Sequence, residues 1–172
     1  MRRRNVEHAD ARGSFTELWR ASLTAPLDAE PMVQANLSRS RAGTLRRMHF
    51  HLHQADLWLL VEGQAAAATT DLRPLLTGGA AVSQVFKFER GDALYIPRLV
   101  AHGFLALTDV ALVYLVSREY DASDEHGFAW DDAAAAIEWP AVPGTVSGRD
   151  RDNPRLHDVI DGLLQRERSA GA

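Results

Sequence analysis

The chain has 172 residues, which predicts one domain by the usual range of about 100–200 residues per domain. Its 46% hydrophobic and 24% charged residues exclude a disordered chain, and its lack of cysteine excludes disulfides, thiolate zinc sites and a cysteine nucleophile. The net charge of −4 and the scattered arginines argue against a nucleic-acid partner, because nucleic-acid binding requires a concentrated basic patch.

The N-terminal segment begins Met-Arg-Arg-Arg, and no apolar stretch follows it. It therefore does not have the pattern of a secretory signal. No window of the sequence approaches the roughly 20 apolar residues that a membrane span needs. We expect a cytoplasmic protein without a membrane partner.

Between about residues 31 and 117 the sequence predicts a barrel core made of short strands. The candidate strands are Val33–Ser38, Leu45–His51, Leu57–Glu62, Gln64–Asp71, Val82–Glu89, Ala93–Pro97, His102–Leu107 and Val110–Ser117. Many short strands separated by glycine-containing turns predict an all-β sandwich or barrel. The run Ala65–Ala68 lies inside a strand pattern and predicts a tightly packed interior.

Residues 121–168 are predicted to form a loop and a short C-terminal helix, which complete a single domain over residues 1–172. The segment Asp121–Pro140 contains acidic turn clusters and two tryptophans, and we expect a structured loop there. Asn153-Pro154 predicts an N-cap and a proline at the first helical position. The apolar residues that follow recur at helical spacing, so the helix is expected to pack on the sheet or on a second subunit.

Histidines, a carboxylate and glycines recur in two regularly spaced stretches, which are Gly43, His49, His51, Asp56 and Gly63, and then Gly91, Pro97 and His102. The two stretches resemble the two motifs of the cupin superfamily, with Asp56 for the usual glutamate, Leu99 for a glycine and Ala106 for an asparagine. Residues i and i+2 of a strand share a face, so His49 and His51 are predicted to face one cavity. With Asp56 and His102 they would suit Fe, Mn, Ni or Zn.

A closer resemblance covers about residues 10–150. It rests on Asp10-Ala-Arg-Gly-Ser-Phe-Thr-Glu17, Gln34-Ala-Asn-Leu-Ser-Arg-Ser40, Leu45-Arg-Arg-Met-His49, Tyr95-Ile-Pro97, Ala101-His-Gly-Phe104, Gly127-Phe-Ala-Trp-Asp-Asp132 and Ile137-Glu-Trp-Pro140. In this order they resemble the dTDP-4-dehydrorhamnose 3,5-epimerase family, a branch of the cupins. The resemblance implies a double-stranded β-helix, or jelly-roll barrel, that forms a homodimer. It also implies epimerisation of a nucleotide-linked 4-keto-6-deoxysugar without a cofactor.

The resemblance further implies residue roles. His49 matches the general base, Asp150 the aspartate that orients this base, and Tyr114 the acid that returns a proton to the opposite face. Both proton-transfer groups are needed, because a C–H bond next to a ketone is only weakly acidic. Strand alternation places Arg46 and His49 on opposite faces, so a β-bulge is needed for both to reach one ligand. The residues that match the nucleotide-sugar cleft are Arg12, Phe15, Glu17, Gln34, Asn36, Arg46, His102 and Tyr120.

Departures from the family pattern leave two alternatives open. The family's pocket lysine aligns with Asp56, and the only lysine of this chain is Lys87. Exchanging a cation for an anion beside a developing oxyanion is unfavourable. The first alternative is therefore a metal-dependent oxygenase or isomerase with a divalent ion bound by His49, His51, Asp56 and His102. The second is a cupin that binds a sugar nucleotide without catalysis.

Overall fold

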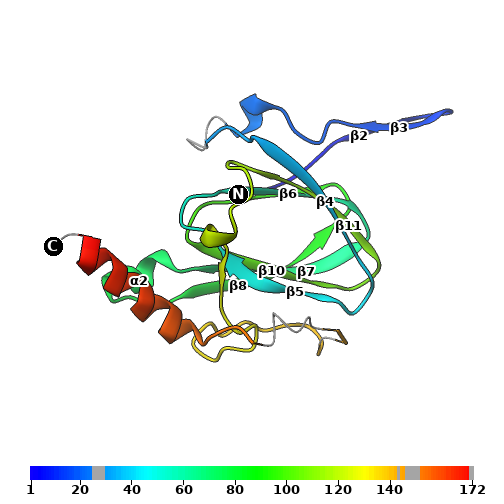
Figure 1. The fold of residues 1–172 in the computed structure, drawn as a ribbon. Coiled ribbons are helices and arrows are strands. Elements are labelled where there is room, and N and C mark those ends of the chain that lie inside the picture. The colour runs from blue at the N-terminus through cyan, green and yellow to red at the C-terminus, as the bar shows by residue number, and fades with distance from the viewer. Residues whose placement is uncertain (25–29, 143, 146–151, 171–172) are drawn as a thin grey trace.

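Two five-stranded antiparallel sheets face each other in the computed structural model and form the barrel in Figure 1. The structure describes residues 1–24, 30–142, 144–145 and 152–170. The first sheet has the order β1-β9-β6-β11-β4, and the second has the order β12-β5-β10-β7-β8. The strands are β1 (Arg2–Arg4), β4 (Gln34–Ser40), β5 (Leu45–Phe50), β6 (Asp56–Glu62), β7 (Gln64–Asp71), β8 (Val82–Glu89), β9 (Asp92–Ile96), β10 (Val100–Ala106), β11 (Val110–Val116) and β12 (His126–Gly127).

The predicted strands of the barrel core are all confirmed, with ends that differ by at most two residues. The alanine run Ala65–Ala68 lies on β7 between β10 and β8 and is buried, as predicted. Its small side chains leave room for the large rings of Trp58, Phe88 and Phe104, which pack in the same core cluster. Trp58 and Phe104 meet edge to face, with ring centroids 5.6 Å apart, a favourable aromatic arrangement.

Helix α2 (Leu156–Ala170) packs on the second sheet, where Leu156, Ile160 and Leu163 join the core cluster that contains Met48 and Phe50. The prediction that Pro154 occupies the first helical position is wrong, because α2 begins two residues later. Its N-terminal group Leu156 N–H donates to Asp132 Oδ2 at 2.8 Å. The cap therefore comes from the preceding loop, which sequence spacing does not reveal. No helix in the described ranges is long and apolar enough to cross a membrane.

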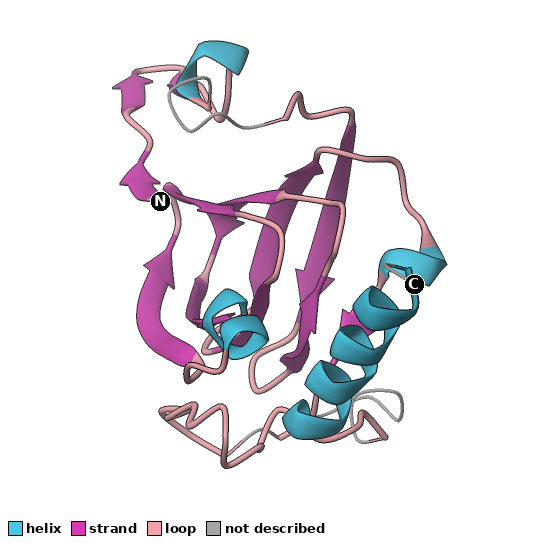
Figure 2. Ribbon diagram, turned by 90° about the vertical axis from the view of Figure 1, so that its left-hand side faces the viewer, coloured by secondary structure: helices cyan, strands magenta, loops and turns pink. Residues whose placement is uncertain are grey.

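The segment Asp121–Pro140 is structured, as expected, and contains the 3-10 turn η4 (Ala122–Asp124) and strand β12. The described residues also include the 3-10 turns η1 (Ala21–Leu23) and η3 (Arg73–Thr77). In Figure 2 helix α2 lies along one side of the barrel, at the right of the view.

The N-terminal hairpin of β2 (Glu7–Asp10) and β3 (Gly13–Thr16) was not predicted. Among the described residues these strands pair only with each other, and they project away from the barrel at the upper right of Figure 1. The hairpin is almost fully exposed, and Phe15 retains 68% of its accessible surface. Because it buries no face against the described part of the chain, it has no hydrophobic period from which it could be predicted.

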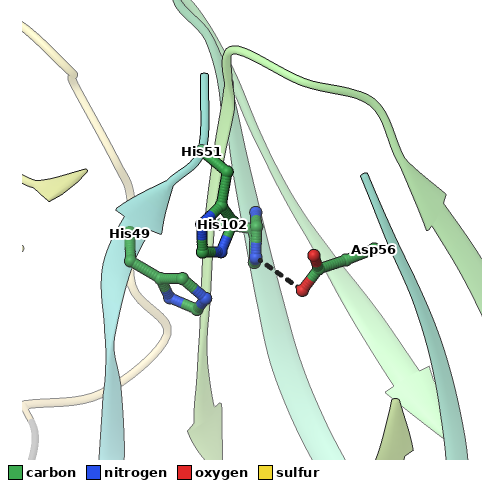
Figure 3. A group of neighbouring side chains, drawn as sticks. All are labelled: His49, His51, Asp56 and His102. Atoms are coloured by element: carbon green, nitrogen blue, oxygen red, sulfur yellow. Dashed lines mark ion pairs between the residues drawn. The ribbon is translucent and has the colours of Figure 1, made fainter. Parts of the chain in front are cut away.

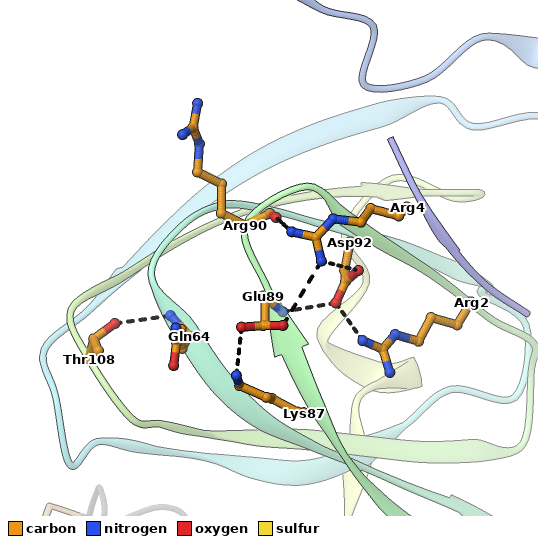
Figure 4. A network of polar contacts seen from close by, with 8 residues as sticks. All are labelled: Arg2, Arg4, Gln64, Lys87, Glu89, Arg90, Asp92 and Thr108. Carbon is orange, nitrogen blue, oxygen red and sulfur yellow. Dashed lines mark hydrogen bonds and ion pairs between the residues drawn. The ribbon is translucent and has the colours of Figure 1, made fainter. Parts of the chain in front are cut away.

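A polar network attaches β1 to the rim of the barrel (Figure 4). The buried carboxylate of Asp92 accepts hydrogen bonds from Arg2 Nη2 at 2.6 Å and from the Glu89 N–H at 2.9 Å. Lys87 forms an ion pair of 2.7 Å with the Glu89 carboxylate, and its side chain is exposed. The only lysine of the chain therefore belongs to this network.

Candidate active site

A cavity of about 640 Å³ opens between the two sheets. Its walls come from β4, β6 and β11 of the first sheet and from β5 and β10 of the second. The lining residues are Gln34, Asn36, Ser38, Arg46, His49, His51, Gln54, Asp56, Trp58, Phe104, Leu112, Tyr114, Val116, Tyr120 and Glu125. Most residues that the sequence singled out thus meet in one place.

Strand β4 supplies a polar strip of this wall. Gln34, Asn36 and Ser38 line the cavity at alternate positions, whereas Ala35 and Leu37 between them are exposed on the other face. Gln34 Nε2 donates to Asn36 Oδ1 at 2.9 Å, which fixes both amides. The period of two along a strand therefore arranges hydrogen-bonding groups toward a ligand.

Tyr114 lies on β11 between two apolar lining residues, and its neighbours Val113 and Leu115 pack on the outer face of the sheet. Burial raises the pKa of the Tyr114 hydroxyl, and the negative charges of Asp56 and Glu125 raise it further. The phenol therefore stays protonated through neutral pH and can donate a hydrogen bond or a proton.

A β-bulge on β5 brings Arg46 and His49 to the same cavity, as the sequence required. His102 of β10 pairs with His49, but Phe104 pairs with Arg46, so three steps on β5 match two steps on β10. The extra residue rotates one side chain to the opposite face. Arg46 Nε donates to Ser40 Oγ at 2.9 Å, which orients the guanidinium at the edge of the cavity.

His51 is held by the loop that follows β11. Its Nδ1 lies 2.8 Å from the Asp124 carbonyl oxygen, and this carbonyl can only accept, so Nδ1 carries the proton. The carboxylate of Asp124 accepts from the N–H groups of Leu52 and His53 at 2.8 and 3.1 Å. Burial lowers the pKa of His51, although nearby carboxylates oppose this shift.

The turn before β10 is also tied to His51. Leu99 has a φ of 61°, a left-handed conformation that glycine adopts most readily. This explains why the cupin pattern has a glycine at this position. The Leu99 N–H donates to the His51 carbonyl oxygen at 2.9 Å, so the strained turn fixes the backbone of His51.

His102 and Asp56 are both only 2% exposed. His102 Nδ1 donates to the Val100 carbonyl oxygen at 2.9 Å, and its Nε2 lies 3.3 Å from Asp56 Oδ2. Burial acts to raise the pKa of Asp56, but the contact with His102 and the charges of His49 and His51 outweigh it and lower the pKa to about 2. Asp56 is therefore a carboxylate at neutral pH.

Figure 3 shows how the three histidines and Asp56 converge from β5, β6 and β10. One ligand atom from each of His49, His51, Asp56 and His102 lies within 4.8 Å of the others. The ring centroids of His49 and His102 are 4.1 Å apart, and those of His49 and His51 are 5.4 Å apart. Imidazoles and a carboxylate at these distances can relay protons or bind a transition metal.

Some predicted site residues do not reach this cavity in the same chain. Arg12, Phe15 and Glu17 lie on or just after the projecting hairpin, where Arg12 forms an ion pair of 2.7 Å with Asp10. Asp150, the predicted partner of His49, lies outside the described residues. The remaining predicted residues line the cavity, except that His102 contacts His49 and Asp56 from behind the lining.

Sequence reasoning missed several lining residues, which are Ser38, Gln54, Trp58, Phe104, Leu112, Val116 and Glu125. The period of two could have identified four of them. Ser38 and Trp58 lie two positions after predicted residues of β4 and β6, and Leu112 and Val116 lie two positions either side of Tyr114. Nothing in the local sequence points to Glu125, because it comes from an irregular loop.

The model of the family described as dTDP-4-dehydrorhamnose 3,5-epimerase matches residues 3–158 of the chain. A dTDP-4-dehydrorhamnose 3,5-epimerase of Mycobacterium tuberculosis is 36% identical over 92% of this chain and 84% of the relative. A dTDP-4-dehydrorhamnose 3-epimerase of Streptomyces niveus is 34% identical over 92% of this chain and 80% of the relative.

Solved structures of similar proteins share the fold. NovW, a 4-keto-6-deoxy sugar epimerase from Streptomyces spheroides, has a TM-score of 0.84 at 29% identity and covers 95% of this chain and 85% of its own. ChmJ, a 3'-monoepimerase from Streptomyces bikiniensis in complex with dTDP-quinovose, has a TM-score of 0.82 at 26% identity, with coverage of 98% and 93%.

Proposed function

The chain belongs to the dTDP-4-dehydrorhamnose 3,5-epimerase family, and from this premise we propose how its residues carry out the reaction. It is an epimerase with a cupin jelly-roll fold, and its substrate is a nucleotide-linked 4-keto-6-deoxysugar. The reaction removes a proton from a carbon next to the ketone and returns a proton to the opposite face.

The observation that carries the proposal is the placement of His49 and Tyr114. His49 lies on β5 of the second sheet and Tyr114 lies on β11 of the first sheet, and both line the same cavity. Inversion requires a proton acceptor on one side of the sugar ring and a proton donor on the other. Two opposed walls, each with one suitable group, meet this requirement.

His49 is the general base in this proposal. The neutral form of an imidazole has a free ring nitrogen that can accept the proton from carbon. The packed ring of His102, 4.1 Å away, restricts the orientation of the His49 ring. Asp150 remains the predicted carboxylate that orients His49 and stabilises the imidazolium.

Tyr114 is the acid. Its raised pKa keeps the hydroxyl protonated, so the group is ready to donate when the carbanion forms. Leu112 and Val116 flank it on β11 and line the same apolar part of the wall. This apolar surrounding keeps the hydroxyl neutral until the carbanion forms, because burial disfavours the charged phenolate.

The polar strip of β4 and Arg46 bind the nucleotide part of the substrate in this proposal. Gln34 and Asn36 present amide groups to the cavity, and Arg46 presents a guanidinium. A planar guanidinium donates two parallel hydrogen bonds to a diphosphate. Tyr120, which is 65% exposed at the rim, offers a ring for stacking against the nucleotide base.

We further propose that the active form is a homodimer in which the N-terminal hairpin enters the cavity of the partner subunit. Arg12 and Phe15 match family positions in the nucleotide-sugar cleft, yet they are exposed on a hairpin that projects from their own barrel. The exposed apolar side chains of Val33 and Leu37 at the edge strand β4 add a surface suited to such an interface.

The test is deuterium wash-in. A dTDP-4-keto-6-deoxysugar incubated with the protein in D2O is expected to gain deuterium at a carbon next to the ketone, with inversion at that carbon. Binding of the sugar nucleotide without any exchange would reject the epimerase and support a binding protein.

A further inference from the structure

Three buried side chains next to His49 have the arrangement of an unassigned metal site. His51, Asp56 and His102 are 8%, 2% and 2% exposed, and they come from the end of β5, from β6 and from β10. With His49, each offers one ligand atom within a range of 4.8 Å (Figure 3). Ligand atoms at 2.0–2.2 Å from one zinc ion are about 3 to 4.4 Å apart, so a small contraction suffices for binding.

Both buried histidines are already oriented by their outer ring nitrogens. The Nδ1 atoms of His51 and His102 lie 2.8 and 2.9 Å from the carbonyl oxygens of Asp124 and Val100. A carbonyl oxygen only accepts, so each Nδ1 carries a proton and each Nε2 is left for another partner. Metal-binding histidines have this outer hydrogen bond in most proteins.

The Nε2 atom of His102 provides a second, independent indication of a metal site. This atom is buried and has no hydrogen-bond partner among the residues that the structure describes, although Asp56 Oδ2 lies 3.3 Å away. The other carboxylate oxygen, Oδ1, accepts from Gln54 Nε2 at 2.8 Å, which fixes the orientation of Asp56. A proton on Nε2 would pair the two groups, as the ion pair in Figure 3 shows, and a metal cation bound by Nε2 and Oδ2 would take the place of that proton.

We propose that His51, Asp56 and His102 bind one divalent transition-metal ion, with His49 beside the open coordination positions. Two imidazoles and one carboxylate suit Zn, Fe, Mn, Co or Ni, and the chain has no thiolate to favour softer ions. His49 is left outside the ligand set because it is less buried than the other three. A bound ion supplies positive charge that stabilises an oxyanion on a bound substrate; this role rests on the proposed function, whereas metal binding does not.

The test is metal titration of protein that was purified without a metal column, stripped with EDTA and dialysed. Co²⁺ binding is followed by visible absorption and Zn²⁺ binding by calorimetry. We expect one ion per chain. Asp56→Asn and His102→Gln are each expected to weaken binding by about 100-fold or more, since loss of outer partners alone costs 10–100-fold. Circular dichroism checks that each variant is folded, and the nearly isosteric Asp56→Asn decides the result where His102→Gln does not fold.

His53→Gln is the matched control, because His53 is exposed two residues after His51 and lies outside the cluster. It is expected to bind the ion as the unchanged protein does, and His49→Asn is expected to retain one ion per chain. The proposal is overturned if the unchanged protein binds neither ion, if Asp56→Asn binds equally well, or if His49→Asn loses the ion. Metal binding without deuterium exchange would support the metal site and reject the epimerase. Deuterium exchange by a protein that binds no metal ion would support the epimerase and reject the metal site.

Discussion

His49 and His102 are register partners on β5 and β10, and their ring centroids are 4.1 Å apart. The ring of Trp58 packs edge to face against that of His102, with ring centroids 5.1 Å apart. His102 is therefore packed between the proposed base and the aromatic core, and its own Nδ1 is fixed by a backbone carbonyl. The position of His49 thus depends on residues from three strands.

The first prediction concerns His49→Asn. We expect deuterium exchange to fall by about 10²–10⁴-fold, the usual contribution of a general base. Binding of dTDP is expected to change by less than about 1 kcal/mol, because the base acts in the transition state and not in ground-state affinity. Single-turnover exchange and calorimetry measure the two quantities, with His53→Asn as the control. Normal exchange in His49→Asn would refute the assignment of the base.

Tyr114→Phe should separate proton removal from inversion. The variant keeps the ring and loses only the hydroxyl, so His49 can still remove a proton and return deuterium from solvent. We expect exchange with retention of configuration, and inversion slower by about 10²–10⁴-fold. Proton NMR of the product in D2O distinguishes the two. Inversion at the original rate would exclude Tyr114 as the acid.

The pH dependence of the inversion rate reports the protonation state of Tyr114. Burial and the nearby carboxylates raise the pKa of Tyr114 above its ordinary value, which is about 10. The protonated acid is then present throughout the neutral and mildly alkaline range and is lost only as the pH rises through the raised pKa. We expect no loss of inversion rate from this group below about pH 10. A Tyr114-dependent fall centred near pH 8 would contradict the raised pKa.

The proposal that the N-terminal hairpin enters the partner's cavity is tested by mixing two inactive variants. Arg12→Ala removes a hairpin residue and His49→Asn removes the base from the barrel. In a mixed dimer, one cavity combines an intact barrel with the partner's intact hairpin. Half of the dimers are mixed after random assembly, so about a quarter of all sites are expected to recover. His49→Asn mixed with Tyr114→Phe is the control, because both changes affect the barrel of their own chain. If the mixture of Arg12→Ala and His49→Asn stays inactive, the proposal that the hairpin enters the partner's cavity is rejected.

Gly63→Ala is predicted to be far more destabilising than Gly78→Ala. Both glycines have positive φ angles, of 84° and 79°. At Gly63 an added methyl carbon would overlap the Asp109 carbonyl oxygen, whereas at Gly78 it meets no atom within 4 Å. We expect a loss of about 3 kcal/mol or more in the free energy of unfolding at Gly63 and about 1 kcal/mol at Gly78. Urea unfolding measures both losses, and equal losses would show that the positive φ angle alone determines the loss of stability.

Local patterns in the sequence determined the strands and the faces of this protein. The i, i+2 rule placed His49 and His51 in one cavity, because the side-chain period of a strand is fixed by its backbone. The need for a bulge between Arg46 and His49 also followed from this period. The resemblance to the family, drawn from ordered motifs, identified the reaction.

Only the tertiary structure decided which distant groups meet and which predicted residues lie away from the cavity. Asp56 and His102 are 46 positions apart in the sequence, and their contact of 3.3 Å depends on how the two sheets pack. The orientation of His51 by Asp124, and the projection of the hairpin that carries Phe15, have no local signal either. Such contacts follow from long-range packing, which the periodicity of a single strand does not encode.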